Sequence, residues 1–234
     1  MKKVAISSLI LLAGISTVGF AANTTNAAKA QPVSAERSSE ASTSSHGLKG
    51  LLSPIASMTA SFQQNVRTEK GRVLQHLSGR LSLKKPGKFR WEVIGKEPRL
   101  VISDGKNVWD YDKELAQVTI QKMNKGQTKA PIFFLTGDVN SLDRDFKVTS
   151  LAANQGACLQ GSDTCFELRP KIDEGAFQWI RIGFKNRALK EMEMLDQLGQ
   201  RSQFIFSDIK VNPPIAEGEF HFTAPKGVDV LHNN

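Results

Sequence analysis

The sequence predicts an α+β domain that consists mainly of antiparallel strands. Most of the chain after residue 62 alternates apolar and polar side chains with a period of two, which is typical of half-buried strands. Turn signals such as Asp104-Gly105 separate the short strands and predict a meander of hairpins. Helical signals occur at only two places, residues 48–62 and 131–144, so the helices supply a thin cover for a long sheet.

The first residues have the features of a secretory signal peptide, residues 1–21. A basic start is followed by an apolar run from Val4 to Phe20 and by small residues at its exit. We expect cleavage after Ala21, with Ala30 as the alternative. No cysteine lies near this exit, so we expect an exported protein without a lipid anchor of its own.

The next segment, residues 22–47, has almost no large apolar side chains and is predicted to be a disordered leader. The remainder, residues 48–234, has the length of one domain with a single core.

The formal charge of the chain is +8, and residues 1–21 hold two lysines and no acidic residue, so the mature chain carries +6. This charge suits an acidic partner or an anionic surface. Nucleic acid is not expected as a partner, because the basic residues are scattered along strands and no helix-in-groove or base-stacking motif is present.

The leading helical pattern places Leu48, Leu52, Met58 and Phe62 on one face of a helix or helix pair. Pro54 lies inside this pattern and is expected to kink the helix or to start a new turn after residue 53.

Residues 81–93 predict a hairpin with a basic turn. Pro86-Gly87 is a turn signal, because proline presets φ and glycine tolerates positive φ. Lysines 84, 85 and 88 therefore cluster at one end of the hairpin. On the outgoing strand Phe89, Trp91 and Val93 share an apolar face. Taken alone, this stretch reads as an ordinary half-buried hairpin with a solvated turn.

Residues 131–135 form a compact apolar segment in which Pro131 is placed to start a helix, and residues 140–144 predict another helical turn. Strand signals return in the last third of the chain, at residues 147–151, 165–170, 178–185, 188–195, 202–211 and 219–223.

The two cysteines of the chain, Cys158 and Cys165, predict a disulfide that closes a hairpin loop in an oxidising compartment. A redox pair or a set of metal ligands is the alternative. Neither is favoured, since the spacing is not Cys-x-x-Cys and the sequence holds no second ligand pair.

No catalytic motif is present in the sequence: we find no Gly-x-Ser-x-Gly elbow, no His-Glu-x-x-His, no phosphate loop and no dinucleotide fingerprint. The four histidines are widely spaced, and Asp143 and Asp145 are interpreted as helix-cap and surface charges. We therefore expect no enzyme, no metal site and no cofactor.

The apolar residues of the last strands indicate a different kind of site. The flexible side chain of methionine adapts to apolar ligands and gaps of irregular shape. Each large apolar residue of these strands, taken alone, is best explained by ordinary core packing. Together with the thin helical cover, these residues indicate an apolar cavity. The residues concerned alternate on two strands and are Met192, Met194, Phe204 and Phe206.

From residue 48 to about residue 230 the chain resembles the LolA family of periplasmic outer-membrane lipoprotein carriers. The resemblance rests on the signal peptide and on the order and spacing of five segments: GLKGLLSPIASMTASFQQ, GRLSLKKPGKFRWEV, LVISDGKNVWDYD, APIFFL and FHFTAPKGV.

The resemblance implies a strongly bent antiparallel sheet, an incomplete β-barrel, closed by a lid of short helices over an apolar cavity. It implies a periplasmic carrier, acting as a monomer, that accepts the acyl chains of lipoproteins from an ABC-type releasing complex in the inner membrane. The carrier hands them to an outer-membrane lipoprotein receptor. A binding module for another lipid or hydrophobic ligand is the alternative.

The resemblance also assigns roles to single residues. The family's basic latch residue at the hairpin turn, usually arginine, falls on Lys85, and an ammonium offers fewer fixed donors than a guanidinium. Apolar positions of the cavity and lid fall on Leu48, Leu52, Met58, Phe89, Trp91, Ile132, Phe133, Phe134 and Leu135.

Overall fold

The computed structural model describes residues 33–123, 133–137, 139, 142–152, 158–172 and 177–233. We describe the unit that begins at residue 33. Its helices and strands, in chain order, are α1 (Val33–Leu52), β1 (Ser57–Arg67), β2 (Val73–Lys84), β3 (Lys88–Ile94), β4 (Arg99–Asp104), β5 (Asn107–Asp112), β6 (Gln117–Lys122), α2 (Phe133–Thr136), α3 (Leu142–Asp145), β7 (Phe146–Leu151), β8 (Thr164–Pro170), β9 (Phe177–Lys185), β10 (Ala188–Asp196), β11 (Arg201–Val211), the 3-10 helix η3 (Glu217–Phe220) and β12 (Asp229–Asn233).

The strands of the described part form one 12-stranded sheet in the order β12-β6-β5-β4-β3-β2-β1-β11-β10-β9-β8-β7. Neighbouring strands are antiparallel except for β12, which pairs with β6 in parallel. The sheet does not close on itself, because β12 and β7 are its two edges. The predicted α+β class with a large antiparallel sheet is confirmed.

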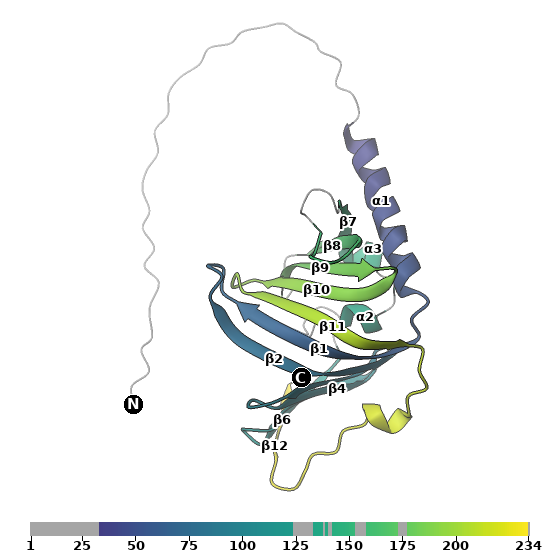
Figure 1. Cartoon of the computed structure of the whole chain (residues 1–234). Helices are drawn as coiled ribbons and strands as arrows, with labels where there is room; N and C mark the ends of the chain where they lie inside the picture. Colours follow the sequence, from purple (N-terminus) through teal and green to yellow (C-terminus); the bar gives the residue numbers. More distant parts are fainter. Residues whose placement is uncertain are drawn as a thin grey trace, which may run out of the picture. The chain divides into compact units, whose positions relative to one another are not determined.

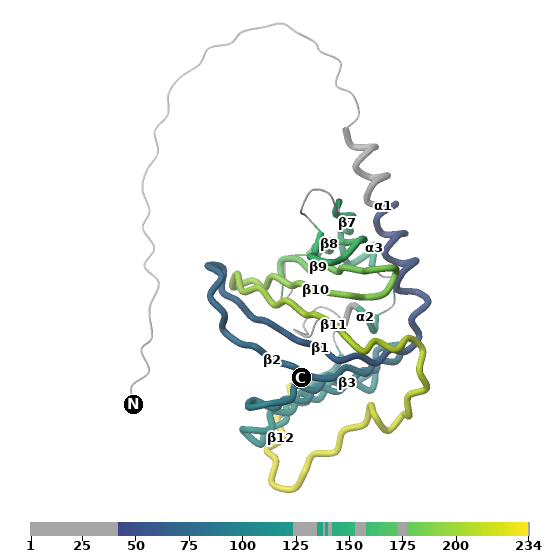
Figure 2. The backbone as a smooth tube through the Cα atoms, in the orientation of Figure 1, coloured from purple at the N-terminus to yellow at the C-terminus, as the bar shows by residue number. Residues whose placement is uncertain are grey.

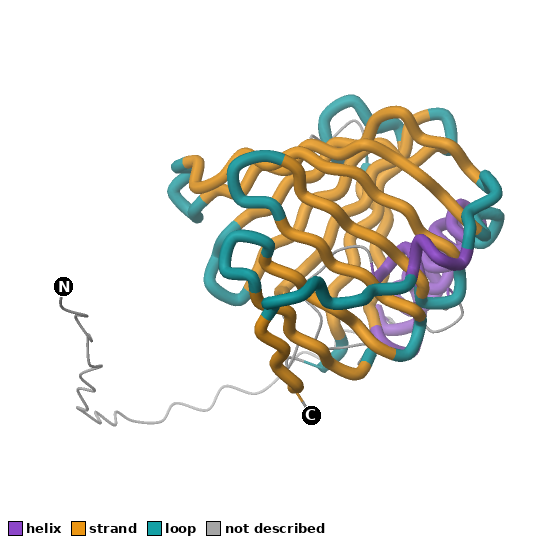
Figure 3. Tube along the Cα trace, turned by 90° about the horizontal axis from the view of Figure 1, so that it is seen from below, coloured by secondary structure: helices purple, strands orange, loops and turns teal. Residues whose placement is uncertain are grey.

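The first strand joins two meanders. β1 pairs with β2 on one side and with β11 on the other, so that Phe62 stands opposite Gly79 and opposite Phe206. On one side β2 to β6 follow one another in chain order as antiparallel neighbours, and on the other side β11 to β7 do so in reverse order. The sheet is strongly curved, and in the view from below its strands wrap around the helices, which lie toward one side (Figures 1 and 3).

The two faces of the sheet differ in what covers them. We call the face that carries Phe62, Leu81 and Trp91 the inner face. It forms one apolar cluster with Leu52 of α1 and Leu135 of α2. We call the opposite face the outer face. The end of α1 and helix α2 therefore lie on the inner side of the sheet (Figure 1).

The predicted hairpin at residues 81–93 is confirmed as β2 and β3. Leu81 pairs with Trp91, and Leu83 pairs with Phe89, all four buried. The turn between them holds a cis peptide bond before Pro86. None of the helices in the described ranges is long and apolar enough to cross a membrane.

The leading helix differs from its prediction at both ends. Residues 33–47, predicted as the second half of a disordered leader, belong to α1. Alanine, glutamate and serine permit a helix here, and its last turns are anchored by packing at Leu48. The predicted helical face over residues 48–62 is wrong beyond Leu52, because Pro54 follows and the chain enters β1.

The C-terminal segment, residues 213–228, covers part of the outer face, and we call it the strap. It contains η3, which contacts β3 and β4, and it leads into β12 at the sheet edge (Figure 2). Beneath it, Leu100 and Ile102 are buried although they alternate with the inward-facing Val101. The strand predicted at residues 219–223 is wrong, because Phe220 ends a 3-10 turn and is buried there.

Candidate functional site

The candidate site is the apolar inner face beneath the helices. Period-two alternation aims the apolar residues of β1, β2 and β3 to this side, and α1 and α2 add side chains from above. The predicted residues that the structure brings into this one cluster are Leu48, Leu52, Met58, Phe89, Trp91, Leu135, Met192, Phe204 and Phe206, all buried, with Met194 partly buried against it.

The side chains of three predicted lid residues are not among those that the structure describes. Phe133 and Phe134 lie in α2, and their side chains fall outside the described part of the structure. Ile132 lies outside the described residues altogether.

Aromatic rings form the centre of the inner face. The rings of Phe62 and Trp91 stack with centroids 3.9 Å apart, and Phe204 meets Trp91 edge-on at 5.5 Å. Such pairs add about 0.5–1.5 kcal/mol each beyond the burial of their area. The sequence fits Phe62 to two patterns, the end of the helical face over residues 48–62 and the start of an alternation with Gln64 and Val66. The structure places Phe62 in β1, in agreement with the alternation.

The Phe62 ring lies directly over Gly79, which the sequence reasoning did not single out. A Cβ atom at Gly79 would lie 2.5 Å from that ring and 2.0 Å from the Glu92 carbonyl oxygen. The absence of a side chain at this position therefore lets the ring pack against the backbone of β2.

The basic hairpin turn contacts the helices that cover the inner face. The Lys85 Nζ donates a hydrogen bond to the Leu52 carbonyl oxygen at 2.7 Å. The Gly87 amide donates to the Thr136 carbonyl oxygen of α2 at 3.0 Å. The last carbonyls of a helix lack partners within the helix and carry its negative dipole end, so a lysine ammonium is favoured at this position. One turn thus contacts both α1 and α2.

The link between α1 and β1 is fixed by Asn212, another residue that the sequence reasoning missed. Its side-chain oxygen accepts hydrogen bonds from the amides of Ala56 and Ser57 at 2.8 and 3.1 Å. Its amide group donates to the Pro54 carbonyl oxygen at 2.9 Å. Asn212 has φ of 55°, which asparagine tolerates better than most residues.

A second polar attachment joins α1 to α3. Lys49 and Ser45 both donate to the Asp143 carboxylate, and Lys171 donates to the Asp143 carbonyl oxygen. The hydrogen bond from Lys49, followed by that from Ser45, holds the pKa of the Asp143 carboxyl below its usual value. The surface charge predicted at residue 143 therefore binds the leading helix.

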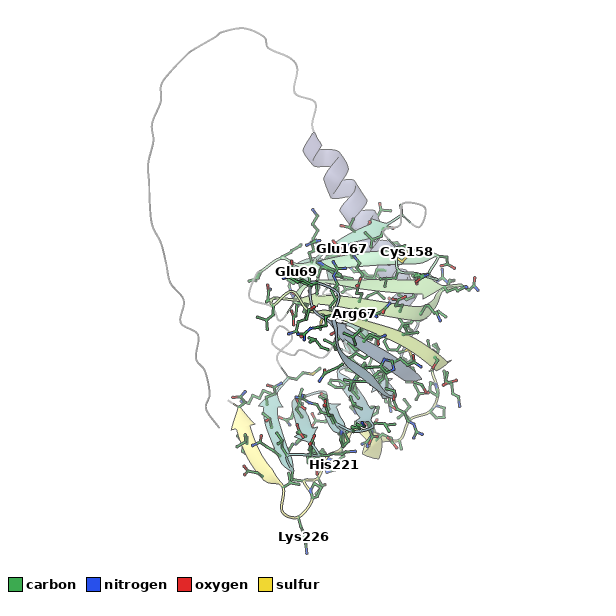
Figure 4. The ribbon with its side chains drawn as sticks, turned by 60° about the vertical axis from the view of Figure 1, so that its left-hand side comes forward. Arg67, Glu69, Cys158, Glu167, His221 and Lys226 are labelled. Atoms are coloured by element: carbon green, nitrogen blue, oxygen red, sulfur yellow. A yellow bond between two sulfur atoms is a disulfide. The ribbon has the colours of Figure 1, made fainter. Side chains whose placement is uncertain are left out.

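The outer side of the hairpin turn carries an ion-pair clamp. Lys84 and Lys88 each lie 2.6 Å from a carboxylate oxygen of Glu217 on the strap. The hydrogen bond from Lys84, together with that from Lys88, lowers the pKa of Glu217 to about 2. His221 and Lys226 mark the further course of the strap, and Lys226 projects away from the sheet (Figure 4).

The predicted disulfide between Cys158 and Cys165 is present in the structure, with their Cα atoms 5.4 Å apart. It closes the loop that leads into β8, and the two cysteines are not members of the inner-face cluster (Figure 4). The Ser162 side chain of this loop lies over Gly183 of β9, where a Cβ atom would approach its hydroxyl oxygen to 2.3 Å.

Comparison with known proteins identifies the family of this fold. A family model described as outer membrane lipoprotein carrier protein LolA matches residues 53–223. The chain is 38% identical to the outer-membrane lipoprotein carrier protein of Pseudomonas paraeruginosa over 184 residues, which cover 79% of this chain and 85% of the relative.

The corresponding protein of Hahella chejuensis is 36% identical over the same length, and the match covers 79% of this chain and 86% of that protein. A solved LolA superfamily protein from Nitrosomonas europaea aligns with a TM-score of 0.43 at 10% identity, covering 74% of this chain and 97% of that one. On the family model and the sequence relatives, this chain belongs to the LolA family of outer membrane lipoprotein carrier proteins.

Proposed function

We propose that this protein is a periplasmic carrier that binds the acyl chains of lipoproteins on its inner face and delivers them to the outer membrane. The observation that carries the proposal is a continuous apolar face that packs against the end of α1 and against α2, both of which accept a hydrogen bond from the hairpin turn. Twenty-six buried hydrophobic residues of the described part form this cluster, and such a surface suits an acyl chain. Membership in the carrier family supports the same role.

Acyl chains reach this face only when the helices move. Leu52 and Leu135 are almost completely buried against the strands, so their side chains occupy the surface that a ligand needs. Once the helices are displaced, each methylene group that leaves water for the inner face stabilises the complex by about 0.8 kcal/mol. Bound acyl chains thereby replace the contacts that the helices lose.

Lys85 acts as the latch of this lid in our proposal. Its ammonium bonds the terminal carbonyl region of α1, while Gly87 of the same turn bonds α2. The closing and opening of the lid then depend on this one turn. A lysine at this position, in place of the family's usual arginine, offers fewer hydrogen-bond donors to the lid.

The partners follow from the carrier role. An ABC-type complex of the inner membrane supplies the acylated lipoproteins, and an outer-membrane receptor accepts them. The mature protein reaches the periplasm after removal of residues 1–21.

Recovery of bound lipoproteins tests the proposal. The full chain is expressed in a bacterium that makes outer-membrane lipoproteins, and it is purified from the periplasm and examined by mass spectrometry for acylated proteins. We expect Met192→Gln, which places an amide on the inner face, to lower the recovery. Leu198→Gln is the matched control, because Leu198 is 81% exposed.

The outcome separates two functions. Acylated proteins support the carrier, whereas phospholipid or quinone alone would indicate a carrier of other lipids. Absence of any bound lipid from the folded wild-type protein would contradict both. Thermal unfolding of each variant shows whether a lower recovery reflects lost binding or lost structure.

A further inference from the structure

The outer face carries a polar cleft that is separate from the lipid-binding inner face. It has a volume of about 360 Å³, within the range of small-ligand sites. Its floor comes from β2 and β3, where the outward residues alternate with the buried Leu81 and Leu83. Its upper wall comes from the strap. The lining residues are Arg80, Ser82, Arg90, Glu92, Gly218 and Glu219.

A guanidinium on the floor of this cleft is left without a counter-charge. Arg80 stands opposite Glu92 in the β2–β3 register. The Glu92 carboxylate, however, lies 2.9 Å from Lys113 and 3.3 Å from Arg90. The Arg80 side chain forms no ion pair or hydrogen bond with any residue in the described part of the chain. Its full set of donors therefore remains available to a ligand.

A carboxylate on the strap is also left without a counter-charge. Glu219 forms no ion pair with any of the residues that the structure describes, although it lines the same cleft as Arg80. The residues before and after Glu219 hold its position: Glu217 forms ion pairs with two lysines, and the Phe220 side chain is buried. The amide of Glu219 also donates to the Ala216 carbonyl oxygen at 3.1 Å. The wall that presents this carboxylate is therefore held in place before any ligand binds.

We propose that this cleft binds a small zwitterion that carries a phosphate group and an amine. The phosphate oxygens accept hydrogen bonds from Arg80, Arg90 and the Ser82 hydroxyl, since guanidinium groups and phosphate match in charge and geometry. The ammonium group of the ligand faces the Glu219 carboxylate. The shared chemistry is that of phosphoethanolamine, either as a soluble compound or as the head group of a phospholipid.

Titration of the mature protein with soluble phosphoethanolamine and with inorganic phosphate tests the site. Amide NMR signals report where each probe binds, and we expect shifts at Arg80, Ser82, Gly218 and Glu219. Arg80→Gln removes one charged donor and should weaken both probes by about tenfold or more. Arg72→Gln is the matched control, because Arg72 is an exposed arginine outside the cleft.

Glu219→Gln distinguishes a zwitterion from a simple anion. Removal of the carboxylate should weaken phosphoethanolamine but leave inorganic phosphate unchanged or bound more tightly, because a repulsive charge is lost. Weaker binding of both probes, or of neither, would overturn the assignment of Glu219 to an ammonium group. Melting curves confirm that each variant is folded.

Vesicles identify the source of the head group. If the ligand is a lipid, vesicles containing phosphatidylethanolamine should retain the wild-type protein, whereas Arg80→Gln should be retained less. If the ligand is a soluble compound, phosphoethanolamine shifts the cleft amides and the same vesicles do not retain the protein. Retention by phosphatidylglycerol vesicles alone, or no shift at the cleft amides at millimolar probe concentration, would overturn the proposal.

Discussion

Replacement of Lys85 by methionine tests the attachment between the hairpin turn and the leading helix. Methionine keeps most of the apolar stem and removes the ammonium that lies 2.7 Å from the Leu52 carbonyl oxygen. A hydrogen bond to a charged group contributes about 1.5–3 kcal/mol, and the half-buried position of Lys85 reduces this to about 1–2 kcal/mol. The closed arrangement of α1 should weaken by the same amount.

That free energy corresponds to a five- to thirtyfold increase in the population with α1 detached. Amide hydrogen exchange measures it at Ser53, whose amide donates to the Lys49 carbonyl oxygen in the last turn of α1. Urea denaturation should show a loss of no more than about 2 kcal/mol, because the sheet does not depend on this bond.

Two comparisons make the result specific. Lys96→Met removes an exposed lysine that lies outside the turn and should leave the exchange at Ser53 unchanged. Lys85→Arg keeps the positive charge and should lose less than Lys85→Met. Unchanged exchange at Ser53 in Lys85→Met, with the protein folded, would refute the latch role of this bond.

Three further predictions concern the sheet and the strap. Gly79→Ala should destabilise the fold by about 1–3 kcal/mol in urea denaturation, because the added Cβ atom would meet the Glu92 carbonyl oxygen. In the control Gly50→Ala in α1, the added Cβ atom meets nothing within 4 Å and should stabilise the fold by up to about 1 kcal/mol. Equal effects of the two substitutions would contradict the packing argument. Phe220→Ala should cost about 3 kcal/mol in the same assay, because the ring is buried on the outer face; a loss below about 1 kcal/mol would show that the strap contributes little. The pKa of Glu217 is lowered from 4.5 to about 2, so the contribution of its ion pairs to stability is complete above pH 4.5 and is lost as the pH falls toward 2. Over this range the protection of the strap amides, measured relative to their intrinsic exchange rates, should decrease in the wild type but not in Glu217→Gln. The same decrease in Glu217→Gln would contradict the clamp.

The sheet was largely predictable from the sequence, because alternation is a local signal. Around β2 and β3 the pattern specified which residues face inward, and the turn residues specified the hairpin. The disulfide was predictable because the two cysteines of the chain are close in sequence.

The end of the leading helix was predicted wrongly because two periodicities coincide. Leu48, Leu52, Met58 and Phe62 fit a helical face, but Met58 and Phe62 also fit a strand, since an even spacing keeps side chains on one side of it. Pro54 ends the helix, so Met58 and Phe62, which follow it, belong to the strand.

The strap and the link at Asn212 were not predictable, because they depend on contacts between distant segments. Asn212 bonds residues more than 150 positions earlier in the chain. Likewise, the apolar outer side of β4 has no local explanation until Phe220 is placed over it.

The position of β1 in the sheet has a consequence for the order in which the protein folds. The meander from β2 to β6 and the meander from β7 to β11 consist of neighbours in sequence, so each can form as soon as its own residues have emerged. The pairing of Phe62 with Phe206 cannot form until nearly the whole chain is available. Until then β1 has a free strand edge and an uncovered Phe62 ring, and both features favour aggregation with other chains. The long separation in sequence between β1 and β11 therefore sets how much of the chain must be available before this edge is covered.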